Sequence, residues 1–83
     1  MGVNEILTRL TNVFRSVFGN SELTLSRATN AQDVQGWDSL MHINLIVAIE
    51  REFRIRFTTR EIAGFRDVGD LMDSIVRKIS ATG

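Results

Sequence analysis

Asp38 and Ser39 stand out chemically, because they begin an apolar segment that runs to Phe53. Aspartate is a preferred helix N-cap, so Ser39 is predicted at the first helical position. There its hydroxyl lies beside backbone N–H groups that have no intrahelical partner and at the positive end of the helix dipole. Such a position favours a phosphate anion. Ser39 is therefore a candidate for a phosphate ester.

A hydrolytic triad of Ser39, His42 and Asp38 is the competing chemistry, and we reject it. A base three residues after the serine, on the same helix, would have to reach back to the helix end, and no oxyanion hole is evident. We expect no catalytic residues and no enzymatic activity. His42 has the simpler interpretation of a packed or partly exposed side chain. One histidine and no cysteine also make no recognisable metal site.

Composition limits the remaining functions. The 83 residues suffice for one small domain over 1–83, too small for an enclosed catalytic cleft. The formal net charge is zero, which argues against nucleic acid and anionic membranes as partners. No apolar run reaches the roughly 18 residues of a membrane span, and no signal peptide is evident. The lack of cysteine suits the reducing cytoplasm, where we expect the protein to lie. We also expect a free-standing monomer.

Apolar residues from Val3 to Phe18 recur at helical spacing, which predicts a first helix with one buried face that includes Val3 and that Gly19 is expected to end. Residues 20–37 lose this periodicity and are predicted to form a long loop. Such a loop must be functional or packed. The residues that can pack it are Leu23, Leu25, Val34 and Trp37.

Two helices are predicted after the central one. Thr58 and Glu61 form a T-x-x-E capping box, which predicts a short helix through Phe65. Asp67 then begins a last periodic helix, and residues 81–83 are expected to fray. The predicted fold class is all-α: a four-helix bundle with three longer helices, one short third helix and a long loop between the first two.

The apolar positions of the central helix cover roughly 220° of its circumference. One interpretation is that this helix simply lies at the centre of the bundle and packs on several sides. A sharper interpretation divides the arc. The residues predicted to face the core are Leu45, Ile49 and Phe53. The residues predicted to border the short helix and a pocket or partner surface are Leu40, Ile43 and Val47.

The run from Asp38 to Phe53 resembles the D-S-L helix of acyl carrier proteins. The resemblance covers nearly the whole chain, and its specific part runs from Gly36 to about Leu71. In that family the serine of this motif carries 4′-phosphopantetheine. The resemblance therefore implies a covalent site at Ser39, flanked by Asp38 and Leu40, which a phosphopantetheinyl transferase would load from coenzyme A.

The same resemblance implies a place for the cargo. In family members with acyl chains, the chain folds back between the helices. Ile62 and Phe65 match the pocket-lining positions of the family. With Leu40, Ile43 and Val47 they form the predicted acyl pocket or partner face.

Charge distinguishes this chain from the acyl carriers of fatty acid synthesis, which are acidic along the serine helix and meet basic patches on their enzymes. From Asp38 to Arg66 the chain has four acids and five arginines, a local net charge of +1. Met41 and Asn44 stand where acids commonly occur. Basic residues that meet basic patches slow encounter, so we expect partners other than the fatty acid synthase set. The alternative is that these charges are only a solvated face. The residues expected to determine the electrostatic interaction with partner enzymes are Arg51, Arg54, Arg56 and Arg60.

The residues from Gly36 to Ser39 also look like the motif of polyketide and other specialised acyl carriers. Peptidyl carriers usually show paired glycines before the serine dipeptide, and Trp37 breaks that pattern. We therefore predict a carrier that holds acyl intermediates as thioesters and delivers them to partner enzymes of a specialised lipid or polyketide-like pathway. The expected enzymes are acyl-loading ligases, synthases or transferases.

Two alternatives stay open at this point. One is a peptidyl or aminoacyl carrier. The other is a noncovalent helical module that binds a partner helix along Leu40, Ile43 and Val47. The sequence does not specify the cargo.

Overall fold

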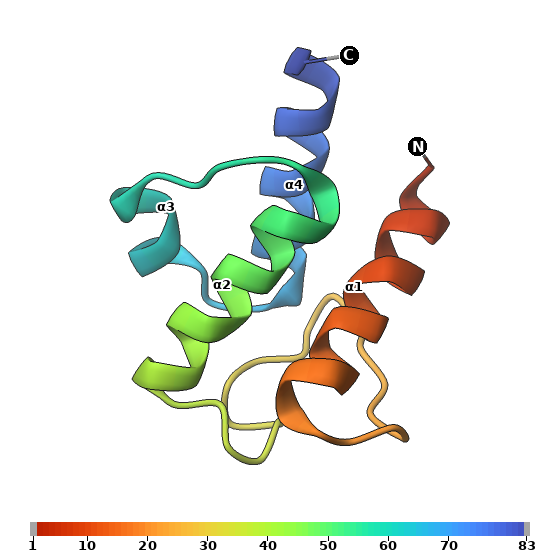
Figure 1. Ribbon diagram of the computed structural model, residues 1–83, viewed down its shortest axis with the longest axis vertical. Coiled ribbons are helices and arrows are strands. Elements are labelled where there is room, and N and C mark those ends of the chain that lie inside the picture. The colour runs from red at the N-terminus through yellow and green to blue at the C-terminus, as the bar shows by residue number, and fades with distance from the viewer. Residues whose placement is uncertain (1, 83) are drawn as a thin grey trace.

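Four α-helices make up the fold in the computed structural model, which describes residues 2–82. They are α1 (Val3–Phe18), α2 (Ser39–Phe53), α3 (Thr59–Gly64) and α4 (Val68–Thr82). Figure 1 shows both chain ends at one end of the bundle and the loop over residues 20–37 at the other. The prediction of an all-α bundle with a short third helix is confirmed.

Helix α1 packs through a single apolar face. Ile6, Leu10 and Phe14 are at most 2% exposed, as their helical spacing predicted. Gly19 ends the helix with φ 63, a left-handed conformation that glycine adopts without strain. Val3 was predicted on the same buried face, but it is 59% exposed because it lies in the first turn, before the first core residue.

The long loop between α1 and α2 is packed by its own apolar residues. Leu23 and Val34 are buried, and Leu25 and Trp37 lie partly buried against the core, as predicted. The Arg15 side chain on α1 donates from Nε to the Leu23 carbonyl at 2.7 Å. The loop is therefore part of the packed structure.

The middle of this loop is also fastened to the start of α4. The N–H of Val68 donates to the Thr29 carbonyl, and the N–H of Gly69 donates to the Arg27 carbonyl, both at 2.8 Å. The Arg27 guanidinium donates to both carboxylate oxygens of Asp73 at 3.0 Å. These contacts hold the loop against α4 and so fix where the chain enters α2.

The helices begin at the predicted caps. The Asp38 carboxylate accepts from the Met41 N–H at 2.8 Å. The Thr58 hydroxyl accepts from the Glu61 N–H at 3.1 Å, and the Thr58 N–H donates to Glu61 Oε1 at 2.8 Å. This is the reciprocal capping box. The short helix ends at Gly64, one residue earlier than predicted.

Asp67 begins α4 as expected, since its side chain accepts from the Asp70 N–H at 2.9 Å. The helix continues through Thr82, and Gly83 lies outside the described residues. The fraying of residues 81–83 therefore stays a prediction. No helix within the described range is long and apolar enough to span a membrane.

The core lies between α1, α2 and α4. Leu45, Ile49 and Phe53 on α2 are 0%, 0% and 7% exposed, so the predicted core side of the central helix is confirmed. Helix α3, which the structure describes completely, contributes no buried residue. Polar contacts and partly buried side chains therefore hold α3 to the bundle.

Candidate functional site

Ser39 occupies the predicted first position of α2 and is exposed. The side chain and the carbonyl of Asp38 accept from the N–H groups of Met41 and His42, each at 2.8 Å. The N–H groups of Ser39 and Leu40 and the Ser39 hydroxyl have no hydrogen-bond partner in the described part of the chain. This open helix start favours an anion bonded to the serine oxygen.

Gly36 shapes the turn before this helix start. Its φ of 91 is a conformation that L side chains rarely adopt. A Cβ atom here would meet only Phe18, at 3.9 Å, so the backbone conformation and not the available space requires glycine. The Gly36 carbonyl accepts from the Asp38 N–H at 3.0 Å, which places the cap directly after the turn.

A cleft of about 540 Å³ opens beside Ser39, between α2, α3 and the end of the long loop. Ile43 on α2 and Ile62 and Phe65 from the α3 region line it, and their role in holding an acyl chain stays a prediction. The remaining lining residues are Ala31, Trp37, Asp38, His42, Thr59, Ala63 and Arg66. The cleft therefore joins a modifiable hydroxyl to an apolar wall.

The other residues of the predicted stripe lie outside the cleft. Leu40 is 71% exposed and Val47 is 41% exposed, and neither lines the cleft. Ile43 is 51% exposed and belongs to both surfaces. The structure thus divides the predicted pocket or partner face into a cleft wall and an open helix face.

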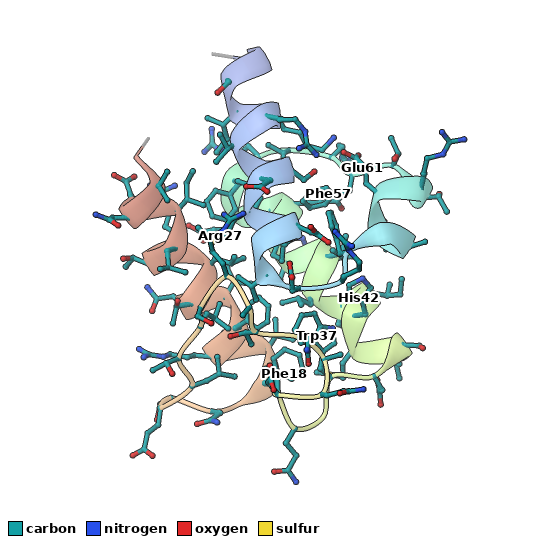
Figure 2. The ribbon with its side chains drawn as sticks, turned by 180° about the vertical axis from the view of Figure 1, so that it is seen from behind. Phe18, Arg27, Trp37, His42, Phe57 and Glu61 are labelled. Atoms are coloured by element: carbon teal, nitrogen blue, oxygen red, sulfur yellow. The ribbon has the colours of Figure 1, made fainter. Side chains whose placement is uncertain are left out.

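His42 bridges three elements at the cleft, a role that sequence reasoning missed. The Trp37 indole N–H donates to His42 Nδ1 at 3.0 Å, and Figure 2 shows the two rings side by side. His42 Nε2 lies 3.0 Å from the Ile62 carbonyl of α3. Because the indole can only donate, Nδ1 accepts, and a proton on Nε2 lets His42 donate to the Ile62 carbonyl. The sequence offered one signal for this contact: Trp37, whose indole can donate a hydrogen bond, precedes His42 by five residues near the helix start.

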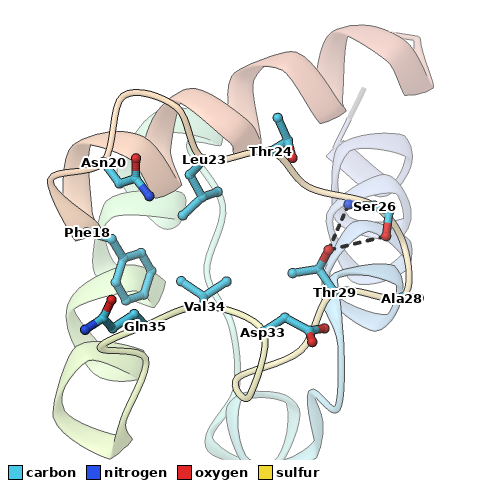
Figure 3. A pocket seen from close by; sticks show the side chains of 10 residues that line it. All are labelled: Phe18, Asn20, Leu23, Thr24, Ser26, Ala28, Thr29, Asp33, Val34 and Gln35. Atoms are coloured by element: carbon cyan, nitrogen blue, oxygen red, sulfur yellow. Dashed lines mark hydrogen bonds between the residues drawn. The ribbon is translucent and has the colours of Figure 1, made fainter.

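A larger hollow, of about 680 Å³, lies under the long loop and does not include Ser39. Figure 3 shows the side chains of Leu23 and Val34 pointing toward each other from opposite stretches of the loop, with polar residues around them. Several of these polar groups bond within the loop: the Thr29 hydroxyl accepts from the Ser26 N–H at 2.9 Å. The smaller cleft is the better candidate site, because it alone contains the modifiable hydroxyl at a helix start.

The four arginines that sequence analysis selected do not line this cleft. They lie at the other end of α2, in the segment after it and on α3, and all four are exposed. Among residues 2–82, no group of three or more His, Asp or Glu side chains could hold a metal ion.

Known proteins resemble the chain in both sequence and structure. The family model described as "Phosphopantetheine attachment site" matches residues 8–75. The solution structure of a holo acyl carrier protein from Geobacter metallireducens is 41% identical and covers 92% of this chain and 87% of its own, with a TM-score of 0.85. A comparison with curated proteins gives no match. The chain therefore belongs to the acyl carrier protein family, whose members are carriers and not enzymes, and its prosthetic group is 4′-phosphopantetheine.

Proposed function

We propose that Ser39 is the residue that carries 4′-phosphopantetheine. The observation that carries this proposal is the exposed Ser39 hydroxyl, which is unpaired within the described chain, begins α2 and lines the cleft. Among the described serines, Ser39 alone begins a helix. The open N–H groups of Ser39 and Leu40 fit a phosphodiester at this position.

The neighbouring residues have distinct roles in this proposal. Asp38 fixes the first turn of α2 by accepting from Met41, which leaves the earlier N–H groups open to the phosphate. Leu40, with 71% of its surface exposed, offers an apolar contact to the phosphopantetheinyl transferase. When bound, the group supplies a thiol that holds an acyl cargo as a thioester. Tethering makes each delivery a local search, so weak contacts with the accepting enzyme suffice.

The cargo contacts the apolar wall of the cleft, formed by Ile43, Ile62 and Phe65. The protein serves a specialised lipid or polyketide-like pathway, with ligases, synthases or transferases that load and accept the cargo. The arginine-rich segment after α2 supports this assignment, because enzymes with basic docking patches would be repelled there.

Intact mass spectrometry tests the attachment. The protein is incubated with coenzyme A and a promiscuous phosphopantetheinyl transferase, and peptide mapping locates the added group. We expect one added phosphopantetheine on Ser39, none on Ser39→Ala, and an unchanged result for the control Ser80→Ala, whose serine is exposed on α4. Addition to another serine, or no addition with a transferase that modifies a control carrier, would show that the proposal is wrong.

A further inference from the structure

A hollow of about 680 Å³ lies at the end of α2 opposite Ser39, and basic side chains dominate its lining. Its lining residues are Val47, Glu50, Arg51, Arg54, Ile55 and Arg56. Three arginines against one glutamate give this lining a net charge of +2. Val47, which is 41% exposed, adds an apolar surface beside the charges.

The nearby acids do not neutralise these arginines. Glu50 Oε2 accepts from the Phe57 N–H at 2.8 Å, which holds its carboxylate at the loop before α3. The Glu52 carboxylate lies 3.8 Å from Arg9 on α1. The guanidinium groups of Arg51, Arg54 and Arg56 form no ion pair with any residue in the described range. They are therefore available to an external anion.

Arg54 also occupies a position where another residue type would be easier to accommodate. It caps α2 with φ 56, a left-handed conformation that glycine adopts most readily. The chain keeps a long basic side chain at the rim of the hollow in spite of this conformational cost. Arg54 therefore places a guanidinium group at the hollow on a backbone that glycine would adopt with less strain.

We propose that this hollow docks an acidic segment of a partner protein. Carboxylates of the partner pair with Arg51, Arg54 and Arg56, whose planar guanidinium groups bind carboxylates in forked geometry. An apolar side chain between those carboxylates packs on Val47. A concave basic surface fits a protruding protein segment better than a flat lipid headgroup layer.

This inference rests on the proposed function, because docking here serves to present Ser39 to the partner. Val47 follows Ser39 by eight residues on the same helix, about 12 Å along its axis at 1.5 Å per residue. The exposed side chains of Leu40 and Ile43 lie in the stretch between. A partner that holds the hollow can therefore contact the exposed face of α2 as far as the modified serine.

Nuclear magnetic resonance titration tests the docking surface directly. The probe is a synthetic peptide in which glutamates flank a central leucine on both sides, and its control has every glutamate replaced by lysine. We expect only the glutamate peptide to shift the arginine Nε–Hε signals and the Val47 methyl signals. Arg51→Gln, Arg54→Gln and Arg56→Gln should each weaken binding about 1.4- to 5-fold, the range for one exposed ion pair.

Arg77→Gln is the matched control, because Arg77 is exposed on α4 and does not line this hollow. It should leave the affinity unchanged, and higher salt should weaken the wild-type interaction. Equal binding of both peptides, or an equal loss with Arg77→Gln, would overturn the proposal. The proposal would also be overturned if phosphatidylglycerol vesicles bound the protein more tightly than the glutamate peptide and displaced it. Self-association of the protein through the Val47 surface would overturn it as well. Transfer of phosphopantetheine to Ser39 is measured separately, so its failure would count against the proposed function alone.

Discussion

Replacing Glu61 by glutamine tests what holds α3 in place. Glu61 Oε1 accepts from the Thr58 N–H at 2.8 Å and lies 2.9 Å from Lys78 Nζ, while Oε2 accepts from the Ser74 hydroxyl at 3.1 Å. Figure 2 shows Glu61 near Phe57, whose ring lies under the same lysine. Since α3, described in full, buries no residue, these contacts should carry much of its attachment to α4.

The expected loss follows from the charge. The one oxygen of a glutamine amide can still accept from the Thr58 N–H, while its NH2 group can only donate to the Ser74 hydroxyl; both bonds are then neutral, and the ion pair with Lys78 is lost. Hydrogen bonds to charged groups contribute about 1.5 to 3 kcal/mol, and the Glu61 side chain is 26% exposed, so we expect Glu61→Gln to cost about 1 to 2 kcal/mol at pH 7.

The effect should depend on pH in a defined direction. The hydrogen bond from Lys78 and that from the Thr58 backbone lower the pKa of Glu61 from 4.5 to about 2. Because the pKa in the folded state is lower than that in the unfolded chain, the stabilisation is complete above about pH 4.5 and is lost as the pH falls toward 2. The difference between wild type and variant should therefore shrink at pH 3.

Urea denaturation at pH 7 and pH 3 measures these differences. Glu22→Gln is the matched control, because its side chain is exposed and makes no hydrogen bond or ion pair among the described residues. It should change the free energy of unfolding by no more than about 0.5 kcal/mol. Hydrogen exchange of the α3 amides should rise in Glu61→Gln. A loss that is equal at both pH values would refute the electrostatic reasoning.

Three further predictions concern stability. Phe53→Ala should lower the free energy of unfolding by about 3 to 5 kcal/mol and Val47→Ala by much less, because the two residues are 7% and 41% exposed. Equal losses in denaturant unfolding would contradict the division of α2 into a core side and an exposed side. Gly69→Ala should cost about 1 to 3 kcal/mol, since its Cβ would lie 3.0 Å from the Arg27 carbonyl, and an unchanged melt would contradict this. Arg54→Gly should raise the free energy of unfolding by about 0.5 to 1 kcal/mol by relieving the left-handed cap, whereas a loss would show that its side chain stabilises the fold.

The helix boundaries could be predicted because their signals are local. Asp38, Thr58 and Gly19 each form capping hydrogen bonds with backbone groups within five residues. The spacing of residue types is therefore enough to place the helix ends. The same holds for the core side of α2, which helical periodicity determines. The exposed position of Val3 was missed, because periodicity gives the face of a residue but not how far the core extends along the helix.

The contacts of the cleft depend on residues that are distant in sequence. Periodicity placed His42 among apolar neighbours, but the Ile62 carbonyl that it contacts is 20 residues away. The capping box predicted the hydrogen bonds between Glu61 and Thr58. The contacts of Glu61 with Ser74 and Lys78 depend instead on where α4 packs. Because no residue of α3 is buried, and the structure describes all of them, these distant polar contacts position it together with the partly buried Ile62. These contacts therefore set one wall of the cleft beside Ser39, which makes this wall the part of the candidate site that local sequence determines least.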